Sequence, residues 1–124
     1  MKRRWPLRRG DFALAHARRA AFRQLLTDGG FGDHAMHEVV FGELITNAAR
    51  YGSEPMYVQV SIARRTLKID VVDSGDCFDL RMKLLQEPRS EGGRGLHIVK
   101  SLTSKFTLGK TRDFHCQLSA VVAL

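Results

Sequence analysis

The spacing of hydrophobic positions changes several times along the chain, and each change predicts a different element. After Asp11, apolar residues recur at helical spacing as far as Leu25, and Gly29 and Gly30 follow shortly afterwards. This pattern predicts an amphipathic helix that has Asp11 as its N-cap and ends at Asp28. A second stripe of the same period predicts a helix that begins after residue 33 and stops at residue 52; it comprises Met36, Val40, Leu44 and Ala48.

Strict alternation replaces the helical spacing between residues 56 and 71. Apolar and polar residues alternate on both sides of residues 63–65, which predicts a β-hairpin with one buried face. The alternation is lost between Ser74 and Arg94, so we expect a long connection there, with a short helical turn near residues 80–85. A connection of this length in a compact domain is usually functional or disordered.

The last third of the chain predicts one more helix and one more hairpin. Gly95 opens a helix with Leu96 on its apolar side, Phe106 starts a strand, and apolar residues alternate from Phe114 to the end. Helices that stand apart from mostly antiparallel hairpins predict an α+β fold, a two-layer α/β sandwich with the helices on one face of the sheet. We expect one domain over residues 1–124, because no repeat or linker interrupts them.

Composition and charge narrow the class of protein. The chain is 44% hydrophobic, which suffices for one core, and no apolar run reaches the roughly 20 residues that cross a bilayer. We therefore expect no membrane span and a cytoplasmic location. The net charge of +7 favours an acidic partner.

Much of this charge lies in residues 1–10, where we expect a basic, solvated tail. Trp5 is the only aromatic residue there, so the interleaved aromatics typical of nucleic-acid binders are lacking and nucleic acid is not favoured as a partner. Phe12 and Phe22 lie near the apolar stripe of the first helix, which suggests a surface for a homodimer or another partner. Cys77 and Cys116 lie far apart in sequence, and we expect two buried thiols and neither a disulfide nor a metal site.

Glu43 and Asn47 are the first candidate functional residues. Their i, i+4 spacing places a carboxylate and an amide on one face of the second helix, beside its apolar stripe. A carboxylate at the edge of a core can act as a general base, and an amide oxygen is a hard ligand for Mg²⁺. The simpler interpretation is an exposed glutamate and an asparagine near a helix end.

Two glycine-containing segments are the other candidates. Asp73 and Gly75 follow a strand directly, where a carboxylate can accept a hydrogen bond from an exocyclic amine such as that of adenine, although the same residues are common in turns. Gly93 and Gly95 flank Arg94 before the third helix, and such a helix start can bind phosphate through its backbone N–H groups. A flexible connector is the alternative there.

The order of the three segments is more specific than any one of them. A helix with Glu43 and Asn47, a hairpin that ends in Asp73 and Gly75, a long loop, and Gly93-Arg-Gly-Leu96 opening a helix resemble the N, G1 and G2 boxes of the histidine kinase-like ATPase superfamily. The resemblance covers about residues 36 to 118. The segments 43–52 and 93–102 are most similar to those of the anti-sigma factor serine kinases.

This resemblance implies a role for each candidate residue. Glu43 would be the general base that activates a serine hydroxyl of a protein substrate, and Asn47 would hold Mg²⁺. Asp73 would bind the adenine of ATP with Gly75 lining the base, and residues 76–92 would form the ATP lid. The backbone amides of Gly93, Gly95 and Leu96 would bind phosphates, Arg94 would add positive charge, and Thr111 would support the adenine-binding aspartate.

The implied function is an anti-sigma factor that phosphorylates an anti-sigma antagonist and sequesters a sigma factor. Cys77 departs from the family pattern, because it stands where the G1 box usually has its second glycine. A Cβ there disfavours positive φ or close approach of the nucleotide. The departure keeps open a partner-switching binding module without kinase activity, whereas Glu43 and Asn47 together favour catalysis. A basic nucleic-acid binder with the same fold is a third hypothesis.

Overall fold

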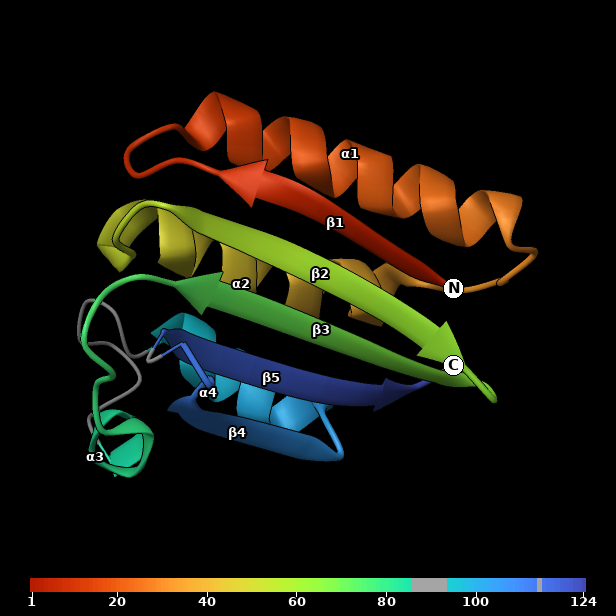
Figure 1. The fold of residues 1–124 in the computed structure, drawn as a ribbon. Coiled ribbons are helices and arrows are strands. Elements are labelled where there is room, and N and C mark those ends of the chain that lie inside the picture. The colour runs from red at the N-terminus through yellow and green to blue at the C-terminus, as the bar shows by residue number, and fades with distance from the viewer. Residues whose placement is uncertain (86–93, 114) are drawn as a thin grey trace.

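The computed structural model of the protein describes residues 1–85, 94–113 and 115–124 and contains a five-stranded sheet. Its strands are β1 (Lys2–Leu7), β2 (Met56–Ala63), β3 (Thr66–Asp73), β4 (Lys105–Lys110) and β5 (Cys116–Ala123). They lie in the order β1-β2-β3-β5-β4, and each neighbouring pair is antiparallel (Figure 1).

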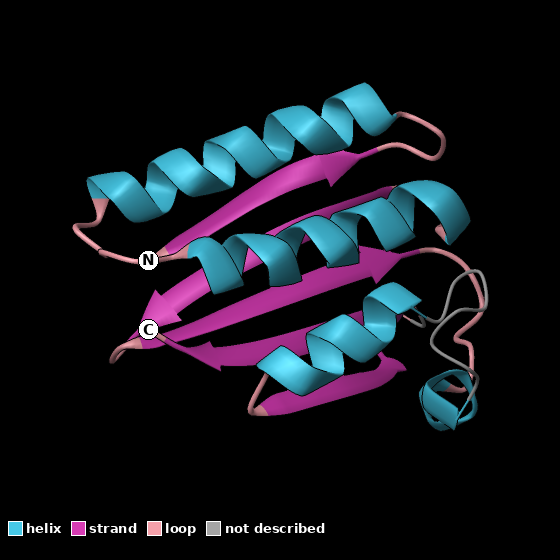
Figure 2. Ribbon diagram, turned by 180° about the vertical axis from the view of Figure 1, so that it is seen from behind, coloured by secondary structure: helices cyan, strands magenta, loops and turns pink. Residues whose placement is uncertain are grey.

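Three helices cover one face of this sheet, namely α1 (Phe12–Asp28), α2 (Ala35–Tyr51) and α4 (Arg94–Leu102) (Figure 2). The short α3 (Leu80–Leu85) lies beyond the end of the strands, where the sequence predicted a helical turn. These layers confirm the predicted α+β sandwich with its helices on one face. None of the helices in the described part of the chain has the length and apolar character needed to span a membrane.

Helix α1 begins at the predicted cap. The Oδ1 atom of Asp11 accepts a hydrogen bond from the Leu14 N–H at 2.9 Å, which satisfies one of the unpaired donors of the first turn. The periodicity predicted Leu14, Ala21 and Leu25 on the buried face, whereas the buried residues are those one position later, namely Ala15, Phe22 and Leu26. Phe22 is fully buried, stacked on Phe41 with 4.3 Å between ring centres, so it is not part of a partner surface. Phe12 is 47% exposed.

Helix α2 is the central helix of the layer and the best covered. It packs against both α1 and α4, which explains why its buried residues extend over two faces; they are His37, Val40, Phe41, Gly42, Leu44, Ile45, Ala48 and Ala49. Gly52 ends the helix by donating its N–H to the Ala48 carbonyl at 2.7 Å, as the sequence predicted. This ending places the last turn of α2 beside the start of β2.

The predicted hairpin of β2 and β3 is confirmed. Arg64 and Arg65 form its two-residue turn, with φ values of 51° and 61°. Two consecutive residues at positive φ match the twist of the strands that they connect. They are the positive-φ residues other than glycine in the described ranges, so Cys77 does not adopt the conformation that would require glycine.

The basic start of the chain is not the predicted solvated tail, because residues 2–7 form the edge strand β1. Leu7 is 4% exposed in the core, and Trp5 meets Phe41 edge to face at 6.0 Å. On the other face, the Arg4 guanidinium lies 4.0 Å from the Tyr57 ring centre. With only Trp5 and Leu7 directed inward, the alternation was too short to be recognised among the arginines.

The expectation of two free thiols is also wrong, because Cys77 and Cys116 form a disulfide with their Cα atoms 5.2 Å apart. They are 39 residues apart in sequence. Antiparallel pairing of β3 with β5 places Asp73 opposite Cys116, and the chain after β3 then passes beside the start of β5. The spacing of the two cysteines in the sequence therefore could not predict the disulfide.

Candidate functional site

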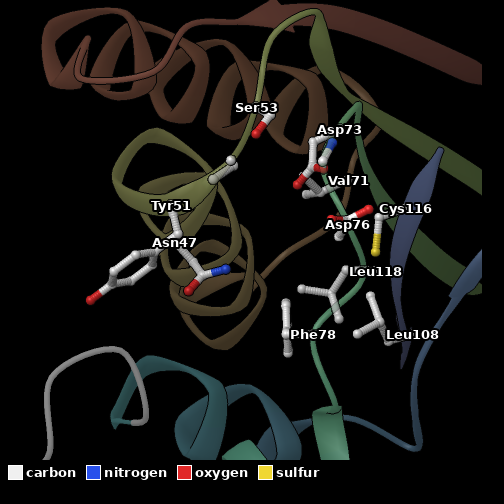
Figure 3. A pocket seen from close by; sticks show the side chains of 13 residues that line it. Asn47, Tyr51, Ser53, Val71, Asp73, Asp76, Phe78, Leu108, Cys116 and Leu118 are labelled. Atoms are coloured by element: carbon white, nitrogen blue, oxygen red, sulfur yellow. The ribbon is translucent and has the colours of Figure 1, made fainter.

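A cavity of about 100 Å³ lies between the end of α2 and the ends of β3 and β5 (Figure 3). Its apolar walls are Val71, Phe78, Leu108 and Leu118, and the side chains of Asn47, Ser53, Asp73 and Asp76 contribute polar groups. Figure 3 shows Asn47 on the α2 side, with Asp73 across the cavity and with Phe78, Leu108 and Leu118 below both. The cavity therefore combines an apolar interior with a few directed polar groups, as small-molecule sites usually do.

Asp73 is held in place by the turn that follows β3. Its Oδ1 atom accepts the Gly75 N–H at 2.8 Å, and the Ser74 N–H donates to the Ser53 carbonyl at 3.0 Å. Its second oxygen, Oδ2, has no hydrogen-bond partner within the described ranges and is available as an acceptor. A carboxylate fixed through one oxygen and free at the other is suited to recognising an amine donor.

Gly75 is required by the tight packing of this turn. A Cβ on Gly75 would lie 2.9 Å from the Ser53 hydroxyl and 3.3 Å from Asp73 Oδ1. Any larger residue would displace the carboxylate or the serine that flank it. The absence of a side chain at Gly75 therefore allows Ser53 and Asp73 to lie close to the backbone of this turn.

Glu43 lies one helical turn before Asn47 on α2, against the start of α4. A Cβ on Gly95 would lie only 2.5 Å from Glu43 Oε2, so glycine is what lets the carboxylate and the α4 backbone come together. Leu96, 2% exposed, anchors the first turn of α4 in the core. The N–H groups of a helix start attract anions in general, and the carboxylate that lies against the start of α4 is that of Glu43.

Of the predicted site residues, Asn47, Asp73 and Gly75 line the cavity, whereas Glu43, Gly95 and Leu96 lie at the start of α4. The remaining three are Gly93, Arg94 and Thr111. Gly93 lies outside the described residues, and for Arg94 only the backbone, which begins α4, is described. Thr111 follows β4 and bonds within its own hairpin, with its hydroxyl accepting the His115 N–H at 3.1 Å. Among the described residues it makes no hydrogen bond to Asp73, and it does not line the cavity. Residues 86–92 of the expected ATP lid also lie outside the residues that the structure describes.

The structure adds residues that the sequence did not single out. Ser53 lines the cavity and abuts both Asp73 and Gly75, while Phe78 and Leu108 close its apolar side. Ser53 lies directly after the helix-ending Gly52, which was a local signal for a turn. Phe78 and Leu108 gave no signal, because only the tertiary fold brings these segments together.

The polar groups of the cavity suit a metal ion that arrives with a phosphate ligand better than a metal ion held by the protein alone. The structure contains, in its described ranges, no cluster of three or more histidine, cysteine or carboxylate groups able to hold a metal. Asn47 offers a single amide oxygen. Mg²⁺ usually takes one or two protein ligands and completes its shell with water and substrate phosphates, so one amide is compatible with that mode of binding.

An aspartate at a strand end and an amide on the facing helix thus border one largely apolar cavity on this α/β sandwich. The family profile of the histidine kinase-like ATPase domain matches residues 11–114. The chain therefore belongs to the histidine kinase-like ATPase domain family, and ATP binding is the function that this membership indicates. Comparison with curated proteins finds no match.

Proposed function

We propose that this chain is an ATP-binding anti-sigma factor and protein serine kinase, which phosphorylates an anti-sigma antagonist and sequesters a sigma factor in the cytoplasm. The observation that carries the proposal is the placement of Asn47 and Asp73 on one cavity, with Glu43 against Gly95 at the start of α4. Membership of the histidine kinase-like ATPase domain family supports ATP as the ligand. The similarity of segments 43–52 and 93–102 to the anti-sigma kinases supports the finer assignment.

The adenine would bind in the apolar part of the cavity. Oδ2 of Asp73 would accept its exocyclic amine, since Oδ1 is already occupied by the Gly75 N–H. Phe78 and Leu118 would cover the faces of the base with apolar surface. Discrimination for adenine would follow from this one acceptor, because a base with a carbonyl in place of the amine would face a carboxylate oxygen.

The phosphates would lie toward the start of α4, because the N–H groups in the first turn of a helix attract anions. Asn47 would hold Mg²⁺, which neutralises phosphate charge. Bound ATP supplies the phosphoryl group. Glu43 would accept the proton of the substrate serine hydroxyl, and its half-buried position at the α4 start keeps it near the phosphate end of the site.

Two variants on one helix test this division of roles. Glu43→Gln should keep Mg·ATP affinity and lose phosphotransfer by about 10² to 10⁴-fold, the usual contribution of a general base. Asn47→Ala should instead reduce the Mg²⁺ dependence of ATP binding, because it removes the metal ligand. The measurements are calorimetric titration with ATP, with and without Mg²⁺, and radiolabel transfer from ATP to a serine of the antagonist.

Glu54→Gln is the matched control, because Glu54 is exposed beyond the end of α2. The substitution removes the same charge outside the site. It should leave binding and transfer unchanged. The antagonist is first obtained by affinity capture from the source cell and identified by phosphoserine mapping. Undiminished transfer by Glu43→Gln would contradict the proposed mechanism.

A second candidate is a partner-switching module that binds nucleotide without turnover. Cys77 at the second G1-box glycine position, tied to Cys116 in the cavity wall, is the observation that favours it. Wild-type protein that binds ATP tightly and phosphorylates no captured partner would favour this module over the kinase.

A further inference from the structure

Two hollows meet at the cysteine pair. The cavity of about 100 Å³ includes Cys116 in its wall. A second, apolar groove of about 610 Å³ runs between α3 and β4 and includes Cys77. Phe78 and Leu108 line both hollows, so these two side chains form the partition between them.

The disulfide holds this partition in place. Cys77 directly precedes Phe78, and its cross-link to Cys116 ties the loop after β3 to the first residue of β5. The Sγ atom of Cys77 also lies 3.6 Å from the Gly109 carbonyl oxygen of β4. The residue that precedes Phe78 is thus cross-linked to β5 and lies close to β4, which restricts movement of Phe78 away from Leu108.

The volume of the cavity with the cross-link present is small for a nucleotide. Ligand pockets usually measure about 300 to 1,000 Å³, well above the 100 Å³ found beside Asp73. The neighbouring groove has the missing space. Displacement of residues 76–79 away from β5 would join the two hollows, and such displacement requires that residue 77 be free of residue 116.

We propose that Cys77 and Cys116 form a redox switch, in which the disulfide keeps the nucleotide cavity small and its reduction lets the cavity open into the groove. This inference rests on the proposed ATP site. It also accounts for a cysteine at a position where the family has glycine. Disulfides in a reducing compartment are usually transient and regulatory, which agrees with the cytoplasmic location proposed for this chain.

The chemistry is thiol–disulfide exchange with a low-molecular-weight disulfide such as oxidised glutathione. The half-exposed Cys77 thiolate attacks one sulfur of that disulfide and releases one thiol, and Cys116 then attacks the mixed disulfide and releases the second. The two protein thiols lose two protons and two electrons, and the small disulfide is reduced to two thiols. Excess dithiol reverses the exchange.

The test compares ATP affinity in the two redox forms of the full chain. The protein is oxidised with glutathione disulfide or reduced with dithiothreitol, and the thiol content is verified by alkylation and intact mass. Calorimetric titration with Mg·ATP should show roughly tenfold weaker binding to the oxidised form. This is the change expected if about a tenth of the oxidised molecules have a cavity open enough to bind ATP. Hydrogen exchange of residues 74–80 should be slower in the oxidised form.

Three variants separate the cross-link from the side chain. Cys77→Ser and Cys116→Ser should bind ATP like the reduced wild type, whether or not oxidant is present. Cys77→Gly removes both the disulfide and the Cβ. If this variant binds ATP with the same affinity as Cys77→Ser, the effect belongs to the disulfide. If Cys77→Gly binds ATP more tightly than every other form, the effect on affinity belongs to the Cβ of residue 77. That result would overturn the switch.

Equal affinity in both redox forms, or tighter binding by the oxidised form, would also overturn the switch while leaving the ATP site intact. A disulfide that raises the melting temperature without changing ATP affinity would be a structural bond only. Absence of ATP binding by every form and variant would instead contradict the proposed function itself, and the switch with it.

Discussion

At the scale of single residues, the turn after β3 fixes Asp73 through one carboxylate oxygen, while the other oxygen accepts no hydrogen bond from the described residues. The Gly75 N–H occupies Oδ1, and Ser53 packs against the same turn. The orientation of the carboxylate is therefore set before any ligand arrives. Preorganisation of this kind lowers the conformational cost of binding.

Asp73→Asn should weaken ATP binding by roughly tenfold to a hundredfold, the effect of about 1 to 3 kcal/mol for a buried polar group that loses its partner. The asparagine oxygen would keep the Gly75 bond, so its amide would present a donor to the adenine amine. Calorimetric titration measures the loss. The control is Asp28→Asn at the far end of α1, which should bind as the wild type does. Unchanged affinity for Asp73→Asn would remove this residue from the site.

At the scale of elements, α1 and α2 are tied together by a three-residue polar contact on their exposed side. Glu38 of α2 forms an ion pair with Arg23 of α1 and bonds His34 Nδ1 at 3.0 Å. The Arg23 hydrogen bond holds the pKa of Glu38 below its usual value of 4.5, against the opposing effect of burial and with help from His34. The ionised form of Glu38 is therefore the one that the folded state favours.

The sign of the pH effect follows from this direction. A carboxyl whose pKa is lowered on folding contributes stability above its unfolded pKa and loses it as pH falls through the folded pKa. Glu38→Gln should thus cost about 0.5 kcal/mol at pH 7, as for other partly exposed pairs, and the difference should vanish well below pH 4.5. Urea denaturation at neutral and acid pH measures it.

Glu54→Gln is again the control, since Glu54 is exposed and makes no ion pair in the described part of the chain. Its stability should follow that of the wild type at each pH. A Glu38→Gln deficit that persists unchanged in acid would show that packing, and not the charge, is what the residue contributes.

At the scale of the whole molecule, β1 completes the sheet and covers part of the core beneath α1. Its register with β2 runs from Lys2 opposite Ser61 to Leu7 opposite Met56. Positive charge and Pro6 along this edge strand disfavour pairing with another sheet, which is a common protection for exposed edges. The basic residues thus occupy a structural position and are not merely a solvated extension.

Leu7→Ala tests this role, because Leu7 is 4% exposed in the common core. It should destabilise the protein by about 2 to 5 kcal/mol, the usual cost of a large-to-small change in a core. Arg9→Ala, at an exposed position just beyond the strand, should change stability by less than about 0.5 kcal/mol. Denaturant unfolding of both variants distinguishes the strand from a tail, for which the two changes would be equally mild.

The sequence alone determined the elements that depend on neighbouring residues. The N-cap Asp11, the end of α2 at Gly52, the hairpin of β2 and β3, and the helix that opens near Gly95 are each encoded within one or two turns of chain. Helical or alternating periodicity requires no knowledge of distant segments. The order of the Glu43, Asp73 and Gly95 segments also sufficed to predict the family, because each motif lies at a fixed place relative to these local elements.

Tertiary structure alone decided what depends on contacts between distant segments. β1 exists because residues 2–7 pair with β2, about fifty to sixty residues away, and bury only two side chains in doing so. The disulfide and the shared walls of the two hollows exist because β3 pairs with β5, which places the loop at Cys77 beside Cys116. Such neighbours are selected by packing and chain closure over the whole core, and no local pattern of residues records that selection.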